Sequence, residues 1–339
     1  MNLHLPLRRL LQTALLCCGL TLLLLFTGCD GSNNSNAQPT SEENTLPGCA
    51  DTSSCASNPE LQIGESRPAQ VHIPADYTPT TRYPLIIILH GYGANGAVQA
   101  AYLGLTDRVD SKQYVLVVPD GTESLNGTRF WNATPACCAR VAAAENQLDE
   151  QQYTAIDDVA YIRELVKEAA ATYSIDIQRI GLIGHSNGGF MALRMVCEAS
   201  ELITSVVSLA GSTFEADSSC TPAADPVSVL IMHGDEDGTI SYDGSEILSA
   251  SYPGAIETAE RFAAHAGCNS SEATMAANLD MVENIEGAET SVVEMPQCER
   301  GTGVALWTLV GAPHIPFPWV QSGQDRFVDW VLEHTREQK

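Results

Sequence analysis

RIGLIGHSNGG, at residues 179–189, decides the fold, and the chain continues from it as FMALRMVCEA to residue 199. Residues 179–184 form a short apolar run typical of a buried strand, and residues 188–199 have the apolar spacing of a helix. A Gly-x-Ser-x-Gly sequence between a strand and a helix forms a sharp turn that presents its serine at the edge of a sheet. The pattern therefore predicts a strand, a tight turn with Ser186 as candidate nucleophile, and a helix.

Strands and helices alternate along the chain from about residue 60. Short apolar runs suited to strands buried on both faces of a parallel sheet lie at residues 84–90, 114–119, 205–210 and 227–233. Further helices are predicted at 157–173, 255–266 and 324–334, a late strand at 304–310 and an edge strand at 71–73. This alternation predicts a doubly wound, mostly parallel α/β sheet with helices on both faces.

Two longer stretches, residues 121–156 and 268–289, interrupt the alternation. We expect them to be insertions over the carboxyl edge of the sheet, where such folds build substrate sites.

A serine hydroxyl becomes an effective nucleophile when a histidine takes its proton. In folds with this turn the chain order is Ser, then Asp or Glu, then His. His314 lies in the Gly/Pro loop GAPHIPFP directly after the predicted strand 304–310, so it is the candidate base. His265 and His334 fall in predicted helices, where packed or solvated histidines are expected. His185 flanks the nucleophile but is expected to point elsewhere.

The acid is expected just past the strand 227–233, where the sequence is HGDEDG. Asp235, Glu236 and Asp237 all compete there, and spacing alone does not separate them. The stretch also partly matches a calcium loop that runs from Asp235 to Glu246. That hypothesis fails because Ile240 stands where the loop requires glycine and no paired helices flank it, so no metal is predicted.

The loop after the strand 84–90 reads HGYG, a turn expected to supply an oxyanion donor in this architecture. The backbone N–H groups of Tyr92 and Asn187 are the candidate oxyanion hole. No phosphate-binding glycine motif follows the first strand, so no cofactor is predicted.

Seven segments together resemble the secreted esterases of the feruloyl esterase and polyhydroxybutyrate depolymerase type, in the α/β-hydrolase superfamily. The resemblance covers about residues 68–330. The segments are LHGYG (89–93), VVPDG (117–121), WNATPACC (131–138), DDVAYI (157–162), GHSNGG (184–189), HGDED (233–237) and GAPH (311–314). The family pattern HG-x-x-D implies that the acid is Asp237, with Ser186 as nucleophile and His314 as base. Many relatives have a tryptophan two residues after the histidine, where this chain has Pro316.

The resemblance implies a carboxylic-ester hydrolase acting on extracellular polymer-linked esters. Trp131, Tyr92 and Phe317 are expected to form an aromatic wall, which would favour a flat acyl group. A feruloyl or related polysaccharide esterase is therefore the first hypothesis, and a polyhydroxybutyrate depolymerase the alternative. A serine peptidase is less favoured because peptidases of this fold usually add a propeller or cap domain. A non-catalytic binding lipoprotein would be favoured by a missing triad residue.

The N-terminus has the pattern of an export signal. Arg8 and Arg9 precede an uncharged, leucine-rich run at residues 10–26, and the run ends in Thr-Gly-Cys at 27–29, which resembles the bacterial lipobox. The run is short for a membrane span, and no basic stop-transfer cluster follows it. We therefore predict a signal peptide at 1–28, lipidation at Cys29, a polar tether at 29–59 and a catalytic domain at 60–339. The protein would be an exported lipoprotein on the bacterial cell envelope, or secreted.

Eight cysteines remain after this processing, and an even number in an exported chain indicates disulfides rather than a zinc site. Sequence proximity favours Cys49–Cys55, Cys197–Cys220 and Cys268–Cys298, which leaves Cys137–Cys138 as a strained vicinal pair. The 42 acidic and 17 basic residues give a net charge of −25, which argues against nucleic-acid binding because phosphate contacts need clustered Lys and Arg. Membrane contact is expected only through the lipid.

Overall fold

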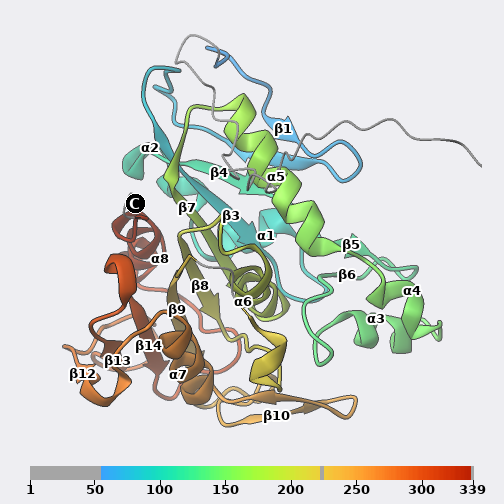
Figure 1. The fold of residues 1–339 in the computed structure, drawn as a ribbon, viewed down its shortest axis with the longest axis vertical. Coiled ribbons are helices and arrows are strands. Elements are labelled where there is room, and N and C mark those ends of the chain that lie inside the picture. Colours follow the sequence, from blue (N-terminus) through green and yellow to red (C-terminus); the bar gives the residue numbers. More distant parts are fainter. Residues whose placement is uncertain (1–54, 222–224, 337–339) are drawn as a thin grey trace, which may run out of the picture. The chain divides into compact units, whose positions relative to one another are not determined.

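The computed structural model describes residues 55–221 and 225–336, which belong to one compact unit. Its centre is a ten-stranded sheet in the order β1-β2-β4-β3-β7-β8-β9-β14-β13-β12 (Figure 1). The six strands from β4 to β14 are parallel neighbours. The predicted doubly wound, mostly parallel sheet is confirmed. The predicted signal peptide, Cys29 and most of the tether lie outside the described residues.

The parallel strands match the apolar runs of the sequence. They are β3 (Tyr83–Leu89), β4 (Val115–Val118), β7 (Ile175–His185), β8 (Ser205–Leu209), β9 (Ser228–Gly234) and β14 (Val304–Leu309). Successive strand side chains point to opposite faces, and in β3 they enter two separate apolar layers. Leu85, Ile87 and Leu89 lie in one layer, and Ile86 and Ile88 lie in the other. Burial on both faces explains why strands such as β3 and β4 are almost entirely apolar.

Helices cover both faces of the sheet. The first layer is packed under α5 (Asp158–Thr172), α6 (Asn187–Ala199) and α7 (Ala255–His265). Figure 1 shows α5 and α6 in front of the sheet. The second layer is packed under α1 (Gly96–Tyr102), α2 (Val109–Lys112) and α8 (Gln321–Glu333). The predicted helices are confirmed, whereas α1 and α2 were not predicted.

The two borders of the sheet differ from the prediction. The predicted edge strand is β2 (Ala69–His72), but β1 (Gln62–Ile63) lies outside it, and β2 is antiparallel to β4. At the other border β13 (Thr290–Met295) and β12 (Thr274–Met275) extend the sheet antiparallel to β14. These border strands are short or only partly buried, so they lack the apolar runs by which the central strands were recognised.

The first insertion, residues 121–156, follows the carboxyl end of β4. It contains the hairpin β5 (Thr122–Glu123) and β6 (Arg129–Phe130) and the helices α3 (Ala139–Glu145) and α4 (Glu150–Thr154). The second hairpin, β10 (Gly244–Ile247) and β11 (Ala250–Pro253), follows β9 and was not predicted. In the second insertion β12 joins the sheet, and Val282 pairs with Trp319 beyond the carboxyl end of β14.

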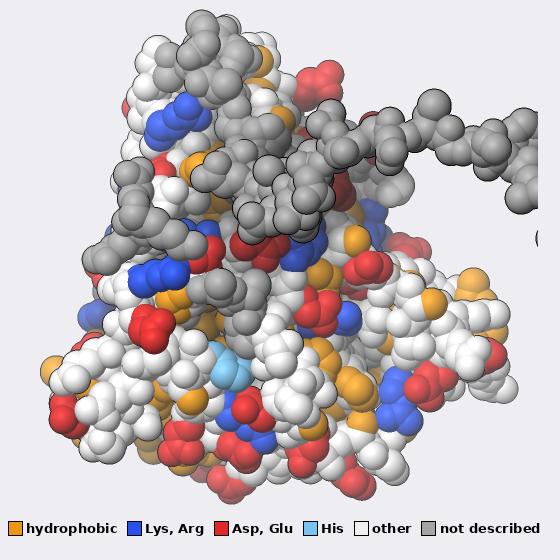
Figure 2. Space-filling view, in the orientation of Figure 1, with side chains coloured by type: hydrophobic (Ala, Val, Ile, Leu, Met, Phe, Trp, Pro, Cys, Tyr) orange, Lys and Arg blue, Asp and Glu red, His pale blue; other side chains and the backbone are white. Residues whose placement is uncertain are grey.

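The structure contains the disulfides Cys137–Cys138, Cys197–Cys220 and Cys268–Cys298, as proximity predicted. Cys55 is also disulfide-bonded, and its predicted partner, Cys49, lies outside the described residues. Figure 2 shows Lys and Arg side chains scattered among acidic ones on the face in view. Within residues 55–221 and 225–336, no helix is both long and apolar enough to cross a bilayer.

Candidate active site

Ser186 occupies a sharp turn between β7 and α6. Its backbone lies at φ 54° and ψ −120°, a left-handed value of φ that side chains other than glycine rarely adopt. Glycines make the turn possible, because a Cβ on Gly188 would lie 2.0 Å from the carbonyl oxygen of Leu89. A Cβ on Gly184 would lie 2.1 Å from the oxygen of Gly188. The predicted strand–turn–helix is confirmed, with the serine at the start of α6.

The chain brings Ser186, His314 and Asp237 into a hydrogen-bonded series. His314 Nε2 lies 2.9 Å from Ser186 Oγ, and His314 Nδ1 lies 2.7 Å from Asp237 Oδ2. Ser186 follows β7, Asp237 follows β9 and His314 follows β14, so all three lie at the carboxyl edge of the sheet. The arrangement has the geometry of a nucleophile, a base and an orienting carboxylate.

Of the three acids that spacing left open, Asp237 contacts His314. Asp235 instead accepts a hydrogen bond from the backbone N–H of Gly311 at 2.6 Å, which supports the turn before His314. Glu236 is exposed.

Asp237 is held as a carboxylate by its surroundings. Burial raises the pKa of Asp237, but hydrogen bonds from His233 and His314 and from the backbone of Thr239 lower it more. The net pKa lies well below its usual range. Asp237 Oδ1 also accepts from the N–H of Ile240 at 2.9 Å, so the carboxylate is fixed in orientation by its own loop. A fixed anion at this position stabilises a cationic imidazole.

His185, which was expected to point elsewhere, contacts the backbone of the candidate base His314. Its Nε2 lies 3.0 Å from the carbonyl oxygen of His314, and the two rings are 5.1 Å apart. Burial, with a smaller effect from His314, lowers the pKa of His185 to about 4. His185 is therefore neutral near pH 7, and its Nε2–H donates to the backbone of His314.

Tyr102 also contacts the loop that carries His314. Its hydroxyl donates to the carbonyl oxygen of Pro316 at 2.8 Å, and its ring packs 5.6 Å from that of His185 and 5.8 Å from that of Trp319. Tyr102 belongs to α1, a helix that was not predicted, and no sequence pattern identified Tyr102 as a residue of the site.

The loop that carries Tyr92 lies against the nucleophile. A Cβ added to Gly91 would lie 3.4 Å from Ser186 Cβ. His90 braces this loop, because its Nε2 accepts from the N–H of Gly121 at 2.8 Å, and Nδ1 then carries the proton and donates to the oxygen of Gly91. The Tyr92 hydroxyl donates to Glu145 Oε2 at 2.6 Å, which links the loop to α3 in the first insertion.

Trp131 does not form part of an aromatic wall, and that expectation is wrong. Its side chain is fully buried, and its Nε1–H donates to the carbonyl oxygen of His90 at 3.0 Å. An indole offers one hydrogen-bond donor, and here the donor is satisfied inside the core rather than at the site. Phe317 and Ile315 are 62% and 58% exposed, so an apolar surface does flank His314.

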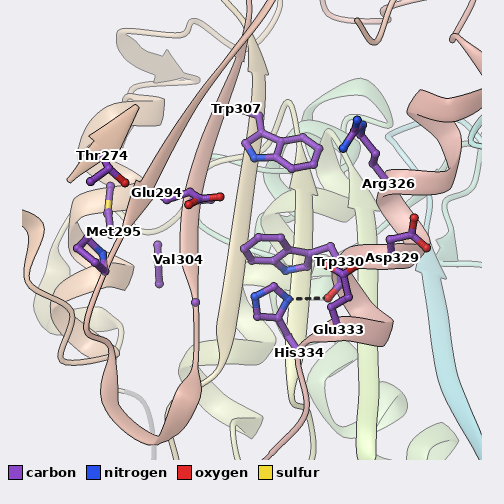
Figure 3. Close-up of a pocket in the computed structure, with 13 residues that line it drawn as sticks. Thr274, Glu294, Met295, Val304, Trp307, Arg326, Asp329, Trp330, Glu333 and His334 are labelled. Carbon is purple, nitrogen blue, oxygen red and sulfur yellow. Dashed lines mark hydrogen bonds between the residues drawn. The ribbon is translucent and has the colours of Figure 1, made fainter. Parts of the chain in front are cut away.

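No group of three or more His, Cys, Asp and Glu side chains in the described part of the chain is arranged to hold a metal ion. A cavity of about 440 Å³ lies between β14 and α8 (Figure 3). Trp307, Trp330 and His334 line it, together with Glu294 and Glu333, and none of the candidate site residues does.

Comparisons with known proteins find esterases among the relatives and structural neighbours of this chain. A family model described as Phospholipase/Carboxylesterase matches residues 77–281, more than half of the chain. Feruloyl esterase D of Neurospora crassa is 24% identical over 291 residues, which cover 80% of this chain and 84% of that protein. Probable feruloyl esterase C of Aspergillus niger is 26% identical over 230 residues, which cover 65% of this chain and 70% of that protein. The solved acetyl xylan esterase from Aspergillus awamori superposes with a TM-score of 0.55 at 13% identity, covering 80% of this chain and 97% of that one.

Proposed function

The chain belongs to the phospholipase/carboxylesterase family and is a carboxylic-ester hydrolase of the α/β-hydrolase type, and from this premise we propose that Ser186, His314 and Asp237 form its catalytic triad. The observation that carries the proposal is the unbroken hydrogen-bonded series from Asp237 through His314 to Ser186 Oγ.

In this mechanism Ser186 Oγ attacks the ester carbonyl carbon while His314 Nε2 takes its proton. Asp237 orients the ring through Nδ1 and stabilises the imidazolium that forms. The tetrahedral intermediate then expels the alcohol, which takes the proton from His314, and an acyl-enzyme remains. Water, deprotonated by His314, attacks the acyl-enzyme and releases the acid. The same groups therefore act twice.

The oxyanion of both tetrahedral intermediates would be held by the backbone N–H groups of Tyr92 and Asn187. Two features support this placement. The Tyr92 loop lies against Ser186, and Asn187 is the first residue of α6, where free N–H groups and the positive end of the helix dipole favour an anion.

We infer that the substrate is a feruloyl or related ester linked to an extracellular polysaccharide. Support comes from the two relatives named as feruloyl esterases. The exposed Phe317 and Ile315 beside His314 also offer an apolar surface to the acyl group. Ring stacking on Phe317 would add about 0.5–1.5 kcal/mol for an aromatic acyl group, and a hydroxybutyrate chain would gain none of this.

The export pattern at residues 1–28 and the cysteine at position 29 support action outside the cytoplasm, with a lipid at Cys29 as the membrane anchor. The carboxylic-ester chemistry does not depend on this anchor.

The decisive experiment compares Ser186→Ala, His314→Ala and the double variant with the native protein on methyl ferulate. Each single change should lower kcat by about a thousandfold or more, and the double change should add little, because the triad acts as a unit. Near-native activity in either single variant would contradict the assignment.

The ratio of kcat/KM for methyl ferulate over a hydroxybutyrate oligomer then tests the substrate. An oligomer preferred by about tenfold or more, roughly 1.4 kcal/mol, would favour the depolymerase instead.

A further inference from the structure

One buried residue, Trp131, contacts both loops that carry the proposed oxyanion donors. Its indole N–H donates to the carbonyl oxygen of His90, two residues before Tyr92. Its backbone pairs with the Asn187 side chain twice. Trp131 N–H donates to Asn187 Oδ1 at 2.7 Å, and Asn187 Nδ2 donates to Trp131 O at 2.9 Å. The residue therefore lies between the two halves of the oxyanion hole.

The Asn187 side chain serves this contact and does not reach solvent. Asn187 is fully buried, and the pairing with Trp131 uses both its amide oxygen and its amide nitrogen. A planar amide that makes two parallel hydrogen bonds to one backbone unit fixes the orientation of that unit. The first turn of α6 and the Trp131 backbone are thus held in a fixed position relative to each other.

The residue after Trp131 joins the first insertion to a charged pair formed by Arg67 and Asp158, the first residue of α5. The next residue, Asn132, donates its backbone N–H to Asp158 Oδ2 at 2.7 Å, and Asp158 pairs with Arg67 at 2.7 Å. The Arg67 guanidinium lies 3.6 Å from the centre of the Tyr161 ring and 5.6 Å from that of Trp131. Asp158 is fully buried, so its charge requires this pairing.

Resting on the proposed function, we propose that Trp131 is a positioning residue that sets the relative placement of the Tyr92 and Asn187 N–H groups. Oxyanion donors stabilise the transition state only when both point at the position that the developing charge will occupy. A residue that hydrogen-bonds to both loops fixes that placement before substrate arrives. Ground-state binding of the ester does not depend on it.

The test is Trp131→Phe, which removes the indole N–H and keeps an aromatic ring in the core. The matched control is Trp330→Phe in α8, because the Trp330 indole nitrogen is enclosed and has no hydrogen-bond partner within the described residues (Figure 3). Activity is measured on p-nitrophenyl acetate and divided by the concentration of active serine, which is counted by labelling with a fluorophosphonate. This correction removes any loss that comes only from misfolded protein.

Loss of one oxyanion donor costs about 10²–10³ in kcat, and a displaced donor should cost less, so we expect Trp131→Phe to lower kcat about 10- to 100-fold. KM should change by less than about threefold, because the contacts that bind the substrate and the transition state equally are not altered. Benzeneboronic acid, which adds to a serine hydroxyl as a tetrahedral anion, should bind more weakly by a factor close to that in kcat. The affinity for ferulate, a product acid, should stay unchanged, and Trp330→Phe should match the native protein in all four readouts.

A kcat per active serine within about twofold of the native value in Trp131→Phe overturns the proposal, and so does an equal loss in Trp330→Phe. If Trp131→Phe does not fold, Asn187→Ala tests the same coupling from the other loop. It removes the amide pairing and keeps the Asn187 N–H, and it should show the same split between kcat and KM. Failure of the proposed function gives a different result, since Ser186→Ala would then remain active.

Discussion

His185 Nε2 lies 3.0 Å from the carbonyl oxygen of His314, so the residue beside the nucleophile holds the backbone of the candidate base. The contact joins residues on β7 and on the loop after β14, and it fixes the base loop relative to the elbow. The contact needs a proton on Nε2, which the neutral ring carries, and burial disfavours the charged form of the ring. The stability of the site is thereby tied to the protonation of His185.

This relationship predicts a pH dependence of stability. The pKa of His185 is lowered from 6.5 to about 4 in the folded chain, so between these values the unfolded state binds more protons than the folded state. Stability contributed by the neutral ring is complete above pH 6.5 and falls by about 3 kcal/mol as the pH drops towards 4. Urea unfolding of the native protein and of His185→Gln at pH 7 and pH 4.5 measures this loss in the free energy of unfolding.

The variant should lose less stability than the native protein over this interval. The lowered pKa of Asp237 acts in the same direction, since its contribution is also lost as pH falls, but it is present in both proteins and cancels in the difference. Equal losses in the two proteins would show that His185 is not the group responsible.

Asp237→Asn should lower kcat by about 10⁴-fold, because an amide can neither hold the His314 tautomer nor stabilise the imidazolium. Glu236→Gln is the matched control, because it makes the same acid-to-amide change one residue away on an exposed side chain. It should leave kcat within about twofold of the native value. Steady-state kinetics on methyl ferulate measure both. A comparable loss in the control would mean that the acidic loop as a whole, rather than Asp237, is required.

Gly188→Ala should destabilise the fold by about 3 kcal/mol or more, because the new Cβ would lie 2.0 Å from the backbone oxygen of Leu89, the last residue of the central strand β3. Gly238→Ala introduces the same methyl group where no heavy atom lies within 4 Å and should cost less than about 1 kcal/mol. Thermal unfolding and the yield of soluble protein distinguish the two. A stable Gly188→Ala protein would be incompatible with the tight elbow.

Cys29→Ser should abolish lipid attachment and leave esterase activity unchanged, because the predicted anchor lies far from Ser186 in the sequence. Mass spectrometry of the protein expressed in a bacterial host measures the attachment.

Thiol titration of the denatured, unreduced mature protein should detect no free cysteine among the remaining eight. Two or more reactive thiols would contradict the predicted pairing.

The sequence by itself determined the central sheet, the elbow and the position of the candidate base. Strands buried on both faces are mostly apolar, so β3, β4, β8 and β9 can be recognised without knowing their neighbours. The Ser186 turn is equally local, since glycines at 184 and 188 are required by backbone contacts within and beside the turn itself. His314 followed from its loop after a late strand.

Only the tertiary structure decided how these parts contact one another. Spacing left three acids open and only the family resemblance implied Asp237, whereas the structure shows His314 in contact with Asp237 across 77 positions of the chain. Trp131 could not be distinguished from a pocket aromatic until its indole was seen to donate to His90 and its backbone to pair with Asn187. The physical reason is that burial and turn geometry restrict the residue types of neighbouring positions, so the sequence pattern reveals them. A hydrogen bond between distant segments produces no such local pattern, because the same residue types occur at positions without that bond.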